Sequence, residues 1–571
     1  MALFLRNASD QSSWRRSYTV EHSKYAVLDE DSGLVTLREL TTTLYKNGQK
    51  LYQLMKVAWP PLAVPGDEGY GGAGVSINRS LLTEREKIIY DNGLKNFGVN
   101  LLASERISFR RNITLNMLEC QNITYDRTNL PKAGIVIIFT EEMWSSLMRT
   151  VFSVLDAGPE ELISEIILVD DASQKEHLGK PLEDYIKIFA GKVKLVRLPE
   201  RKGLIVARNV GSQHVTGEIV VFLDGHCEVH KGWLEPLLHR IKEDDSVIAI
   251  PQTDILEWDT FKFHFDNNSN HHMCGFEFDR RYSWIPIPQP DGITRKTWSD
   301  PIGTPTHMGC CLAASKTHFE RLGGYDPGLE IWGCENLELS FKTWMCWGRL
   351  EVIPCSHIAH MYRPKFPYKW VGKPYIYERN CLRVAEVWMD QYKVFYQHRL
   401  SNLQNTVDIG DVSERKAIRE KLKCRSFDWY VKEIFPDIYL PINTTAIGRI
   451  SNLAHPALCI EKDLDEKDKQ PECYQCRPQN EKQYFYLTRE KQIRRDSKCL
   501  SYKIQKKLFV SETCSYDRSK WSYSQDNLII FGESNLCMTL SSNKSTIFMA
   551  TCNSSDTTQQ WSWSRESIIL S

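Results

Sequence analysis

An aspartate and a histidine two residues apart stand at the centre of the chemistry that this sequence predicts. Asp224 and His226 directly follow the apolar run Ile219–Leu223, which is typical of a buried strand. In an extended chain, side chains two residues apart point to the same side, so this carboxylate and this imidazole can bind one divalent cation. Such a ligand pair suits Mn²⁺ or a similar ion. Since an isolated Asp-x-His more often ends a strand with a solvated carboxylate and a core histidine, the surrounding residues must decide between the two interpretations.

Three further groups favour the metal site. Asp170 and Asp171 follow another apolar run, where one carboxylate could accept a hydrogen bond from a nucleoside. Arg201 and Arg208 come later in the chain and could contact a diphosphate. His360 offers a neutral ring nitrogen that could complete the set of metal ligands.

The elements that position these groups are predicted to alternate between strands and helices. Short apolar runs rich in β-branched residues, separated by helical patterns, favour a mostly parallel sheet. In such sheets, ligands bind beyond the carboxyl ends of the strands, where Asp171 and Asp224 fall. The pattern predicts strands over 135–139, 165–169, 193–198 and 219–223, and helices over 143–155, 180–190 and 203–214.

The last 125 or so residues follow a different pattern. Pro436 and Pro441 frame a predicted linker. After it, a cysteine between two apolar or long side chains recurs at intervals of about 40 residues, at Cys459, Cys499 and Cys537, and each is followed by a second cysteine. Three short all-β units of this length predict a threefold trefoil in which a disulfide closes each lobe.

Composition narrows the class of protein. The chain has 571 residues, 42% apolar and 25% charged, which is typical of globular protein. Lys plus Arg and Asp plus Glu are both 72, so the absence of a basic excess disfavours nucleic acid as a partner. No segment approaches the roughly 18 apolar residues of a membrane helix.

Two features favour a secretory compartment. There are 17 cysteines, and eight Asn-x-Ser/Thr sequons begin at Asn7, Asn78, Asn112, Asn122, Asn267, Asn443, Asn543 and Asn553. A targeting segment is not evident, so either the chain starts downstream of an anchor or this product lacks one. The sequence leaves both alternatives open.

Five motifs carry a resemblance to a known family. They are Trp144–Val151, Val169–Ser173, Phe222–Glu228, Tyr325–Asn336 and Ala385–Asp390. From about Ala103 to near its end, the chain resembles the polypeptide N-acetylgalactosaminyltransferases, which start mucin-type O-glycosylation. The C-terminal trefoil resembles the ricin-type lectin domain of that family.

The resemblance implies an architecture, a reaction and a location. We expect a GT-A-type α/β domain, with a mostly parallel sheet flanked by helices, followed by the all-β trefoil. The implied donor is UDP-GalNAc, the cofactor Mn²⁺, and the acceptors Ser or Thr hydroxyls of polypeptides or glycopeptides, with retention of configuration. The family consists of Golgi membrane proteins with a signal anchor. The expected boundaries are a stem over 1–110, the catalytic domain over 111–425, a linker over 426–445 and the trefoil over 446–571.

The resemblance also assigns residues by position. The implied metal ligands are Asp224, His226 and His360. The implied donor contacts are Asp171, Arg201 and Gly225. Catalytic and sugar-side roles fall to Trp332, Glu335 and Asn336, and a loop that closes over UDP would include Arg363 and Tyr368. Without the resemblance, Trp332 is as often a buried core aromatic. Glu335 is then more often a surface carboxylate, and Arg363 and Tyr368 more often belong to an ordinary exposed loop.

Cysteine pairs follow from the same resemblance. It pairs Cys120 with Cys355, Cys346 with Cys424, Cys459 with Cys476, Cys499 with Cys514, and Cys537 with Cys552. The other seven cysteines stay unassigned: Cys227, Cys274, Cys310, Cys311, Cys334, Cys381 and Cys473.

Several positions depart from the usual family pattern on the sugar side. A glycine is replaced by cysteine at Cys310 and again at Cys334, where a side chain makes a positive φ costly. A hydroxyl is missing at Ile138, and Phe366 stands in place of a loop histidine. We therefore keep an alternative hypothesis, in which the chain is a weak or inactive family member that acts as a binding or regulatory protein.

The trefoil departs from the pattern too. Sugar-binding lobes of this type carry Asp two residues after the first cysteine, and here those positions are Glu461, Ser501 and Thr539. Only the first lobe, through Glu461, is expected to bind GalNAc, and weakly. A structural or partner-binding trefoil is the alternative.

Overall fold

The computed structural model describes most of the chain in two compact units. Described are the strand pair β1 (Ala26–Asp29) and β2 (Gly33–Thr36), and residues 59–265, 272–278, 282–286, 295–365, 374–401, 403, 406–462, 470–477, 480–495, 497–502, 508–511, 514 and 520–568. The first unit comprises Met1–Cys274, Trp284–Ile376 and Lys421–Cys424. The second comprises Gly275–Ser283, Tyr377–Glu420 and Arg425–Ser571.

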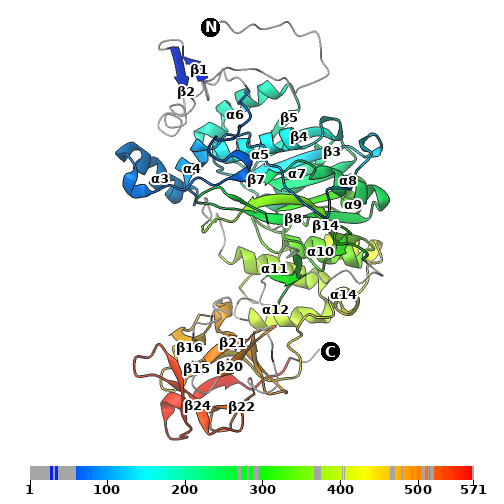
Figure 1. The fold of residues 1–571 in the computed structure, drawn as a ribbon. Helices are drawn as coiled ribbons and strands as arrows, with labels where there is room; N and C mark the ends of the chain where they lie inside the picture. The colour runs from blue at the N-terminus through cyan, green and yellow to red at the C-terminus, as the bar shows by residue number, and fades with distance from the viewer. Residues whose placement is uncertain are drawn as a thin grey trace. The chain divides into compact units, whose positions relative to one another are not determined.

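A ten-stranded sheet forms the centre of the first unit (Figure 1). Its main path runs β12-β14-β8-β13-β6-β3-β4-β5, with β7 paired to β14 and β9 to β8. The strands are β3 (Ala133–Phe139), β4 (Ile163–Asp170), β5 (Val193–Arg197), β6 (Ile219–Asp224), β7 (Cys227–Val229), β8 (Val247–Leu256), β9 (Phe263–His264), β12 (Ile302–Gly303), β13 (Cys311–Ser315) and β14 (Arg349–Met361). The strands β10 (His272–Phe276) and β11 (Tyr282–Pro286) follow β9 in the chain.

The direction of the strands confirms the predicted sheet. β3 pairs in parallel with both β4 and β6, β4 with β5, and β8 with β14. β13 lies between β6 and β8 and is antiparallel to both. All seven residues of β3 are buried, as expected for a strand that is covered on both faces. The four strands predicted from apolar runs are β3, β4, β5 and β6.

Helices cover this sheet. α7 packs on β3 and β4, α8 packs on β8 and β14, and α5 packs on β7. The helices of the unit are α3 (Glu84–Asn96), α4 (Leu101–Arg106), α5 (Trp144–Ala157), α6 (Lys180–Tyr185), α7 (Leu204–Gln213), α8 (Leu234–Glu243), α9 (Lys316–Arg321) and α10 (Glu335–Met345). The predicted helices over 143–155, 180–190 and 203–214 correspond to α5, to α6 with a following 3₁₀ turn, and to α7.

A buried ion-pair group holds the segment before β3 against β7. The carboxylate of Glu228 lies 3.1 Å from Arg111 Nη1 and 3.2 Å from Arg149 Nε. All three side chains are at most 2% exposed. Breaking a buried ion pair is strongly destabilising, because it leaves an uncompensated charge inside the protein. The group therefore fixes β7, which is the antiparallel neighbour of β14, the strand that carries His360.

The second unit contains helices and an all-β region. Its helices are α11 (Ile376–Trp388), α12 (Lys393–Arg399), α13 (Ser413–Lys421) and α14 (Phe427–Glu433). The range 426–445, expected to be a linker, contains α14, because the Ser426 side chain caps that helix by accepting from the Trp429 N–H.

The trefoil residues form an eight-stranded and a four-stranded sheet. Their buried core contains Trp521, Trp561 and Trp563, and the Nε1–H groups of Trp521 and Trp561 donate to backbone carbonyls. The strands are β15 (Thr444–Asn452), β16 (Leu458–Glu461), β17 (Glu472–Gln475), β18 (Tyr484–Thr488), β19 (Ile493–Arg495), β20 (Lys498–Tyr502), β21 (Leu508–Ser511), β22 (Trp521–Tyr523), β23 (Ile529–Phe531), β24 (Leu536–Leu540), β25 (Ile547–Thr551) and β26 (Trp561–Ser564).

Five disulfides match the five expected pairs. They join Cys120 to Cys355, Cys346 to Cys424, Cys459 to Cys476, Cys499 to Cys514 and Cys537 to Cys552. One part of the sequence analysis was incomplete: Cys334, left unassigned there, is disulfide-bonded, and so is Cys381. The cysteine at the former glycine position 334 is therefore not a thiol. Among the described helices, none is both long and apolar enough to cross a membrane.

Candidate functional site

The candidate site lies where three parallel strands end together. In the register of the sheet, Ile138 of β3 is beside Asp224 of β6, and Phe139 is beside Asp170 of β4. The polar residues that follow each strand are therefore brought to one edge. His360 reaches the same place from β14, where it pairs with Cys227 of β7.

Asp224, His226 and His360 converge at this edge. One ligand atom from each lies within 4.8 Å of the others. His360 Nε2 is 3.3 Å from Asp224 Oδ2, and the two imidazole rings are 4.8 Å apart between centroids. The donor set, one carboxylate and two imidazoles, fits Mn²⁺ or a similar divalent ion.

Glu142 fixes the orientation of one of these imidazoles. Its Oε2 lies 3.0 Å from His226 Nδ1, and since a carboxylate only accepts, Nδ1 carries the hydrogen and Nε2 is left for a cation. Its Oε1 accepts from Arg363 Nη2 at 2.5 Å. Burial alone would raise the pKa of Glu142, but Arg363 and His226 outweigh it and hold that pKa at about 2. Glu142 is thus a buried anion that ties a metal-ligand candidate to Arg363.

Arg208 holds the carboxylate of Asp224. Its Nη2 lies 3.0 Å from Asp224 Oδ1, and the guanidinium is 1% exposed. Burial would raise the pKa of Asp224, but the hydrogen bond to His360 and the charge of Arg208 hold it at about 2. Arg208 Nε and Nη1 have no hydrogen-bond partner among the described residues. The aspartate is therefore ionised throughout the neutral range.

The two imidazoles differ in electrostatic environment. Burial lowers the pKa of His226, and Arg363 lowers it further against the opposing effect of Glu142. Burial would also lower the pKa of His360, but negative charge at the Cys310 sulfur and on the Asp224 carboxylate outweighs it and raises that pKa. His226 therefore takes up a proton less readily than an ordinary histidine, and His360 more readily.

Asp171 follows β4, and Arg201, which lies in the loop after β5, reaches Thr140 at the end of β3. The Asp171 carboxylate accepts from the backbone N–H groups of Lys202 at 2.7 Å and Gly203 at 2.8 Å. Arg201 Nη1 donates to Thr140 Oγ1 at 2.9 Å. Burial raises the pKa of Asp171, and the two backbone donors partly offset this. The carboxylate thus shapes the loop that presents Arg201.

A glycine brings this loop against the turn that contains Trp332. Gly203 has a φ of +92°, and a Cβ there would lie 2.2 Å from Ile331 Cα, so only glycine fits. Leu204 N donates to Ile331 O at 3.0 Å. Trp332 follows directly and is partly buried. The chain therefore holds the predicted donor contacts and the predicted sugar-side residues in one place.

Glu335 and Asn336 begin α10. Glu335 Oε2 accepts from the Gly333 N–H at 2.8 Å, and Asn336 Nδ2 donates to His307 O at 3.0 Å. Burial raises the pKa of Glu335, against the effect of Arg208. Cys334, the residue before the helix, has a φ of +59°, the left-handed conformation expected at this former glycine position.

Gly225 and Tyr368 are the two remaining predictions. The Gly225 N–H donates to Ile138 O at 2.9 Å, so its amide hydrogen is already used within the sheet. Tyr368 lies outside the described residues, as does Phe366. Arg363, two residues after the last residue of β14, is placed by its ion pair with Glu142.

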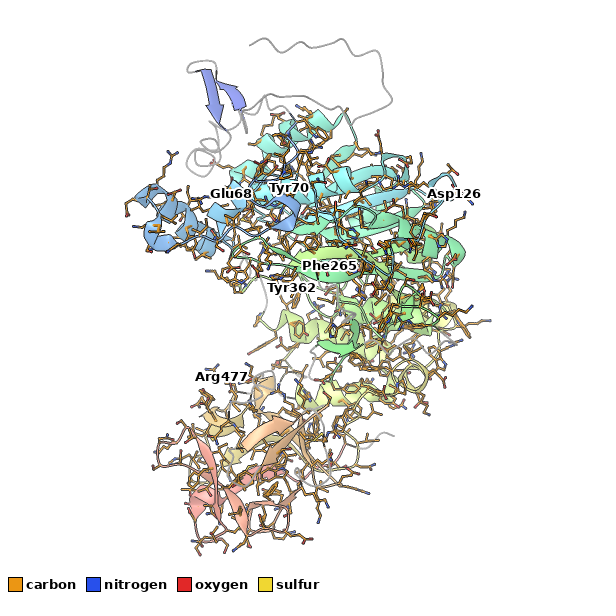
Figure 2. The ribbon with its side chains drawn as sticks, in the orientation of Figure 1. Glu68, Tyr70, Asp126, Phe265, Tyr362 and Arg477 are labelled. Atoms are coloured by element: carbon orange, nitrogen blue, oxygen red, sulfur yellow. A yellow bond between two sulfur atoms is a disulfide. The ribbon has the colours of Figure 1, made fainter. Side chains whose placement is uncertain are left out.

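Apolar side chains are exposed beside the metal-ligand candidates. The ring of Tyr362 is 4.7 Å from that of His360, and its hydroxyl donates to Met308 Sδ at 3.4 Å. Tyr362 is 39% exposed and Ile255, the register partner of His360, is 51% exposed. Figure 2 labels Tyr362 together with Phe265, whose ring lies 5.1 Å from that of His357.

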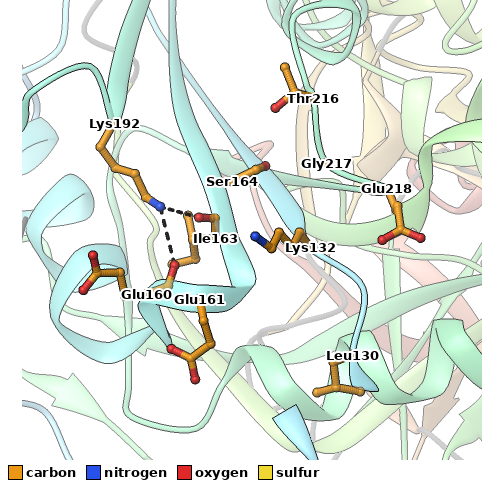
Figure 3. A pocket seen from close by; sticks show the side chains of 10 residues that line it. All are labelled: Leu130, Lys132, Glu160, Glu161, Ile163, Ser164, Lys192, Thr216, Gly217 and Glu218. Atoms are coloured by element: carbon orange, nitrogen blue, oxygen red, sulfur yellow. Dashed lines mark hydrogen bonds between the residues drawn. The ribbon is translucent and has the colours of Figure 1, made fainter. Parts of the chain in front are cut away.

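A cavity of about 880 Å³ lies at the opposite edge of the sheet (Figure 3). Its lining residues precede or begin the strands β3, β4, β5 and β6, and they include Lys132, Glu161 and Glu218. Lys192 Nζ, also in its wall, donates to the backbone carbonyls of Ile163 and Glu160. None of the site residues predicted from the sequence lines this cavity.

The trefoil position predicted to bind sugar is already hydrogen-bonded. Glu461 Oε2 accepts from Asn480 Nδ2 at 2.6 Å and from Gln483 Nε2 at 2.9 Å. In the third lobe, Thr539 Oγ1 donates to Cys537 O at 3.1 Å. The exposed ring of Tyr474 lies on β17, the strand paired with β16.

The sequence analysis missed Glu142 and assigned Arg208 differently. Glu142 follows the predicted strand 135–139, so the rule that placed Asp171 and Asp224 at the strand ends would also have placed it at the site. Arg208 was expected to contact a diphosphate, and the structure pairs it with Asp224.

Comparison with known proteins defines the class first. Residues 134–320 match the model for glycosyl transferase family 2, residues 292–365 match that for the N-terminal domain of galactosyltransferase, and residues 446–561 match that for the ricin-type β-trefoil lectin domain. The chain is therefore a glycosyltransferase with a lectin-type domain.

Relatives define the family. The chain is 39% identical over 88% of its length to polypeptide N-acetylgalactosaminyltransferase 5 of Caenorhabditis elegans, of which 81% is covered. It is 36% identical to polypeptide N-acetylgalactosaminyltransferase 4 of Mus musculus, with 85% of each chain covered. It also resembles the crystal structure of GalNAc-T7 with UDP, GalNAc and Mn²⁺, at a TM-score of 0.73 and 31% identity, covering 90% of this chain and 95% of that one. The chain belongs to the polypeptide N-acetylgalactosaminyltransferase family.

Proposed function

We propose that this protein transfers GalNAc from UDP-GalNAc to Ser or Thr hydroxyls of polypeptides or glycopeptides, with retention of configuration, in the Golgi lumen. The observation that carries the proposal is the convergence of Asp224, His226 and His360 at the carboxyl ends of the strands. GalNAc-T7, the structural relative, was crystallised with UDP, GalNAc and Mn²⁺. A complete ligand group is what a metal-dependent transferase requires, and transfer itself separates the enzyme from the binding-protein alternative.

The cation site follows from this geometry. Asp224 supplies a carboxylate oxygen, and His226 and His360 each supply a ring nitrogen. When bound, Mn²⁺ supplies a Lewis acid that neutralises charge on a departing diphosphate. Glu142 keeps the hydrogen on His226 Nδ1, and Arg208 keeps Asp224 ionised and in place.

The remaining residues bind and orient the substrates. Asp171 and Arg201 contact the donor, and Arg363 lies close enough to the ligand group to place a cation near a leaving phosphate. Trp332, Glu335 and Asn336 contact the sugar and the acceptor. The leaving phosphate itself can take the hydroxyl proton, so positioning contributes more than a strong protein base.

The trefoil has a smaller proposed role. Glu461 is the one carboxylate among the three lobe positions and would give a weak GalNAc contact on glycopeptides. Its part-buried oxygen is shared with Asn480 and Gln483, which limits what it can offer to a sugar.

A transfer assay with matched acid-to-alanine variants tests the proposal. The full chain is given UDP-GalNAc, Mn²⁺ and a panel of peptides and glycopeptides. Asp224→Ala removes a ligand at the carboxyl end of β6 and should reduce transfer by at least about 1,000-fold, since a bound metal contributes several kcal/mol. Glu218→Ala removes an exposed carboxylate just before the amino end of the same strand and should leave transfer unchanged. Mn²⁺-dependent binding of UDP without transfer to any acceptor would instead establish the binding-protein alternative.

A further inference from the structure

Two adjacent cysteines lie as free thiols between two parts of the candidate site. One part is the metal-ligand group at the end of β6, and the other is the start of α10 with Glu335 and Asn336. Cys310 and Cys311 are 6% and 2% exposed, and their Sγ atoms are 3.1 Å apart. Thr253 Oγ1 is 4.0 Å from each sulfur. Twelve cysteines elsewhere in the chain are disulfide-bonded, which is typical of a protein from an oxidising compartment. A pair of free thiols is therefore present where oxidation is the normal chemistry.

The backbone of this pair touches both halves of the site. Cys311 opens β13 and is the register partner of Leu223, the residue before Asp224. On the other side, the Gly309 N–H donates to His307 Nδ1 at 3.0 Å, and the His307 carbonyl accepts from Asn336 Nδ2 at 3.0 Å. Any movement of the peptide between the two cysteines is thus transmitted to the end of β6 and to the start of α10.

We propose that Cys310 and Cys311 form a reversible modification site, at which a small-molecule disulfide oxidises the two thiols to a disulfide between adjacent residues and thereby lowers transfer. The proposal goes beyond the transferase function, and only its effect on transfer rests on that function. Bond formation itself is independent of the reaction that the enzyme performs.

The chemistry is two successive thiol–disulfide exchanges. The Cys310 sulfur, the more exposed of the two, attacks a small disulfide RS–SR, forms a mixed disulfide and releases one RSH. The Cys311 sulfur then attacks the Cys310 sulfur, forms the Cys310–Cys311 bond and releases the second RSH. The two thiol hydrogens leave on the two RSH molecules. The protein is oxidised by two electrons and the small disulfide is reduced by two.

Closing this bond must change the loop. Neighbouring Cα atoms are about 3.8 Å apart across a trans peptide, whereas disulfides usually need about 4.4 to 6.8 Å. The peptide between the cysteines must therefore distort, and the loop of His307 and Gly309 that precedes it must shift. A strained disulfide of this kind is easily reduced, which makes the modification reversible.

Mass spectrometry tests bond formation directly. The full chain is treated with hydroxyethyl disulfide, unfolded, alkylated without reduction and digested with trypsin. The peptide Thr297–Lys316 contains Cys310, Cys311 and no other cysteine. Before treatment we expect this peptide to carry two alkyl groups. After treatment we expect it to carry none and to be lighter by two hydrogens than the unalkylated peptide with two thiols. A peptide that still carries two alkyl groups after treatment overturns the proposal.

Transfer activity tests the consequence. We expect transfer to fall about tenfold on oxidation, about 1.4 kcal/mol, and to recover with a mild monothiol. Cys311→Ala cannot close the bond and should lose much less of its own untreated activity. Cys473→Ala, which removes a buried free thiol from the trefoil, should respond as the wild type does. An equal loss of transfer in wild type and Cys311→Ala overturns the regulatory part of the proposal. So does a closed disulfide in a protein that keeps full transfer. The mass measurement is made on wild type, so it does not depend on whether a variant folds.

Discussion

The metal-ligand group and the first trefoil lobe both contain a carboxylate held by neighbours, yet only the first has the form of a reactive centre. Asp224 is held by a guanidinium, and its second oxygen faces His360. Glu461 is held by two neutral amides that share one of its oxygens. The comparison indicates what makes a carboxylate a strong binding group. Its partners must be charged and buried, and they must leave one of its oxygens directed at the other ligands. The following predictions test that contrast.

Acid should destabilise the first compact unit, called the transferase unit below, far more than the trefoil of residues 446–571. Burial lowers the pKa of His177 to about 4, and the pKa values of His230 and His307 to about 3. Below about pH 6.5 the unfolded chain takes up protons that these folded histidines do not, so stability is full above that pH and falls towards pH 4. At pH 5 the loss is about 2 kcal/mol for each histidine.

The trefoil is the internal control for this prediction, because residues 446–571 contain one histidine, His455. Hydrogen exchange followed by mass spectrometry at pH 7 and pH 5, corrected for intrinsic rates, reports each unit separately. Equal loss of protection in the two units would contradict the prediction.

The disulfide Cys120–Cys355 of the first unit should contribute more to stability than the trefoil disulfide Cys537–Cys552. Cys120–Cys355 closes a loop with a sequence separation of 235, against 15 for Cys537–Cys552. On the loop-closure model, a 15-residue loop contributes about 3 kcal/mol and a 100-residue loop about 4.7 kcal/mol. Paired alanine substitutions at 120 and 355 should therefore cost the transferase unit more than the same change at 537 and 552 costs the trefoil. Denaturant unfolding of the two double variants measures this, and a larger cost at 537 and 552 would refute it.

Glu142→Gln should weaken Mn²⁺ binding about 10- to 100-fold, because outer partners of metal-ligating histidines typically contribute that much. The amide keeps the shape but loses the charge that orients His226 and holds Arg363. Titration of free Mn²⁺ by electron paramagnetic resonance measures the affinity without any assay of transfer.

Glu141→Gln is the matched control, since this neighbouring carboxylate accepts instead from the Gln174 N–H. Glu142→Asp should recover part of the affinity. If Glu141→Gln and Glu142→Gln weaken Mn²⁺ equally, Glu142 has no special role.

Glu461→Ala should have the smallest effect. Transfer to unglycosylated peptides should not change, and transfer to glycopeptides should fall by about threefold, the size expected for one modest hydrogen bond. Steady-state rates on paired peptides and glycopeptides measure this. Ser501→Ala, the corresponding position of the second lobe, should change neither rate, and a loss above tenfold for Glu461→Ala would show a stronger lectin site than the geometry supports.

Local sequence determined the strands and the residues that end them. The apolar runs before Asp171 and Asp224 are long enough and β-branched enough to form buried strands, and parallel strands must end at a common edge. The cysteine spacing of about 40 residues likewise predicted the three trefoil lobes. These features depend on the spacing of apolar residues and cysteines along the chain and on contacts between near neighbours, and both can be read from the sequence.

The partners of the charged groups were decided only by the tertiary structure. Glu142, Arg208 and Arg363 are far apart in the chain, and no spacing rule says which carboxylate a given arginine will neutralise. Packing of β3, β6 and β14 decides it, because a buried charge must be matched by whatever opposite charge the sheet brings within hydrogen-bond distance. The same packing placed the sulfur atoms of Cys310 and Cys311 3.1 Å apart as free thiols, which their being adjacent in the sequence did not predict.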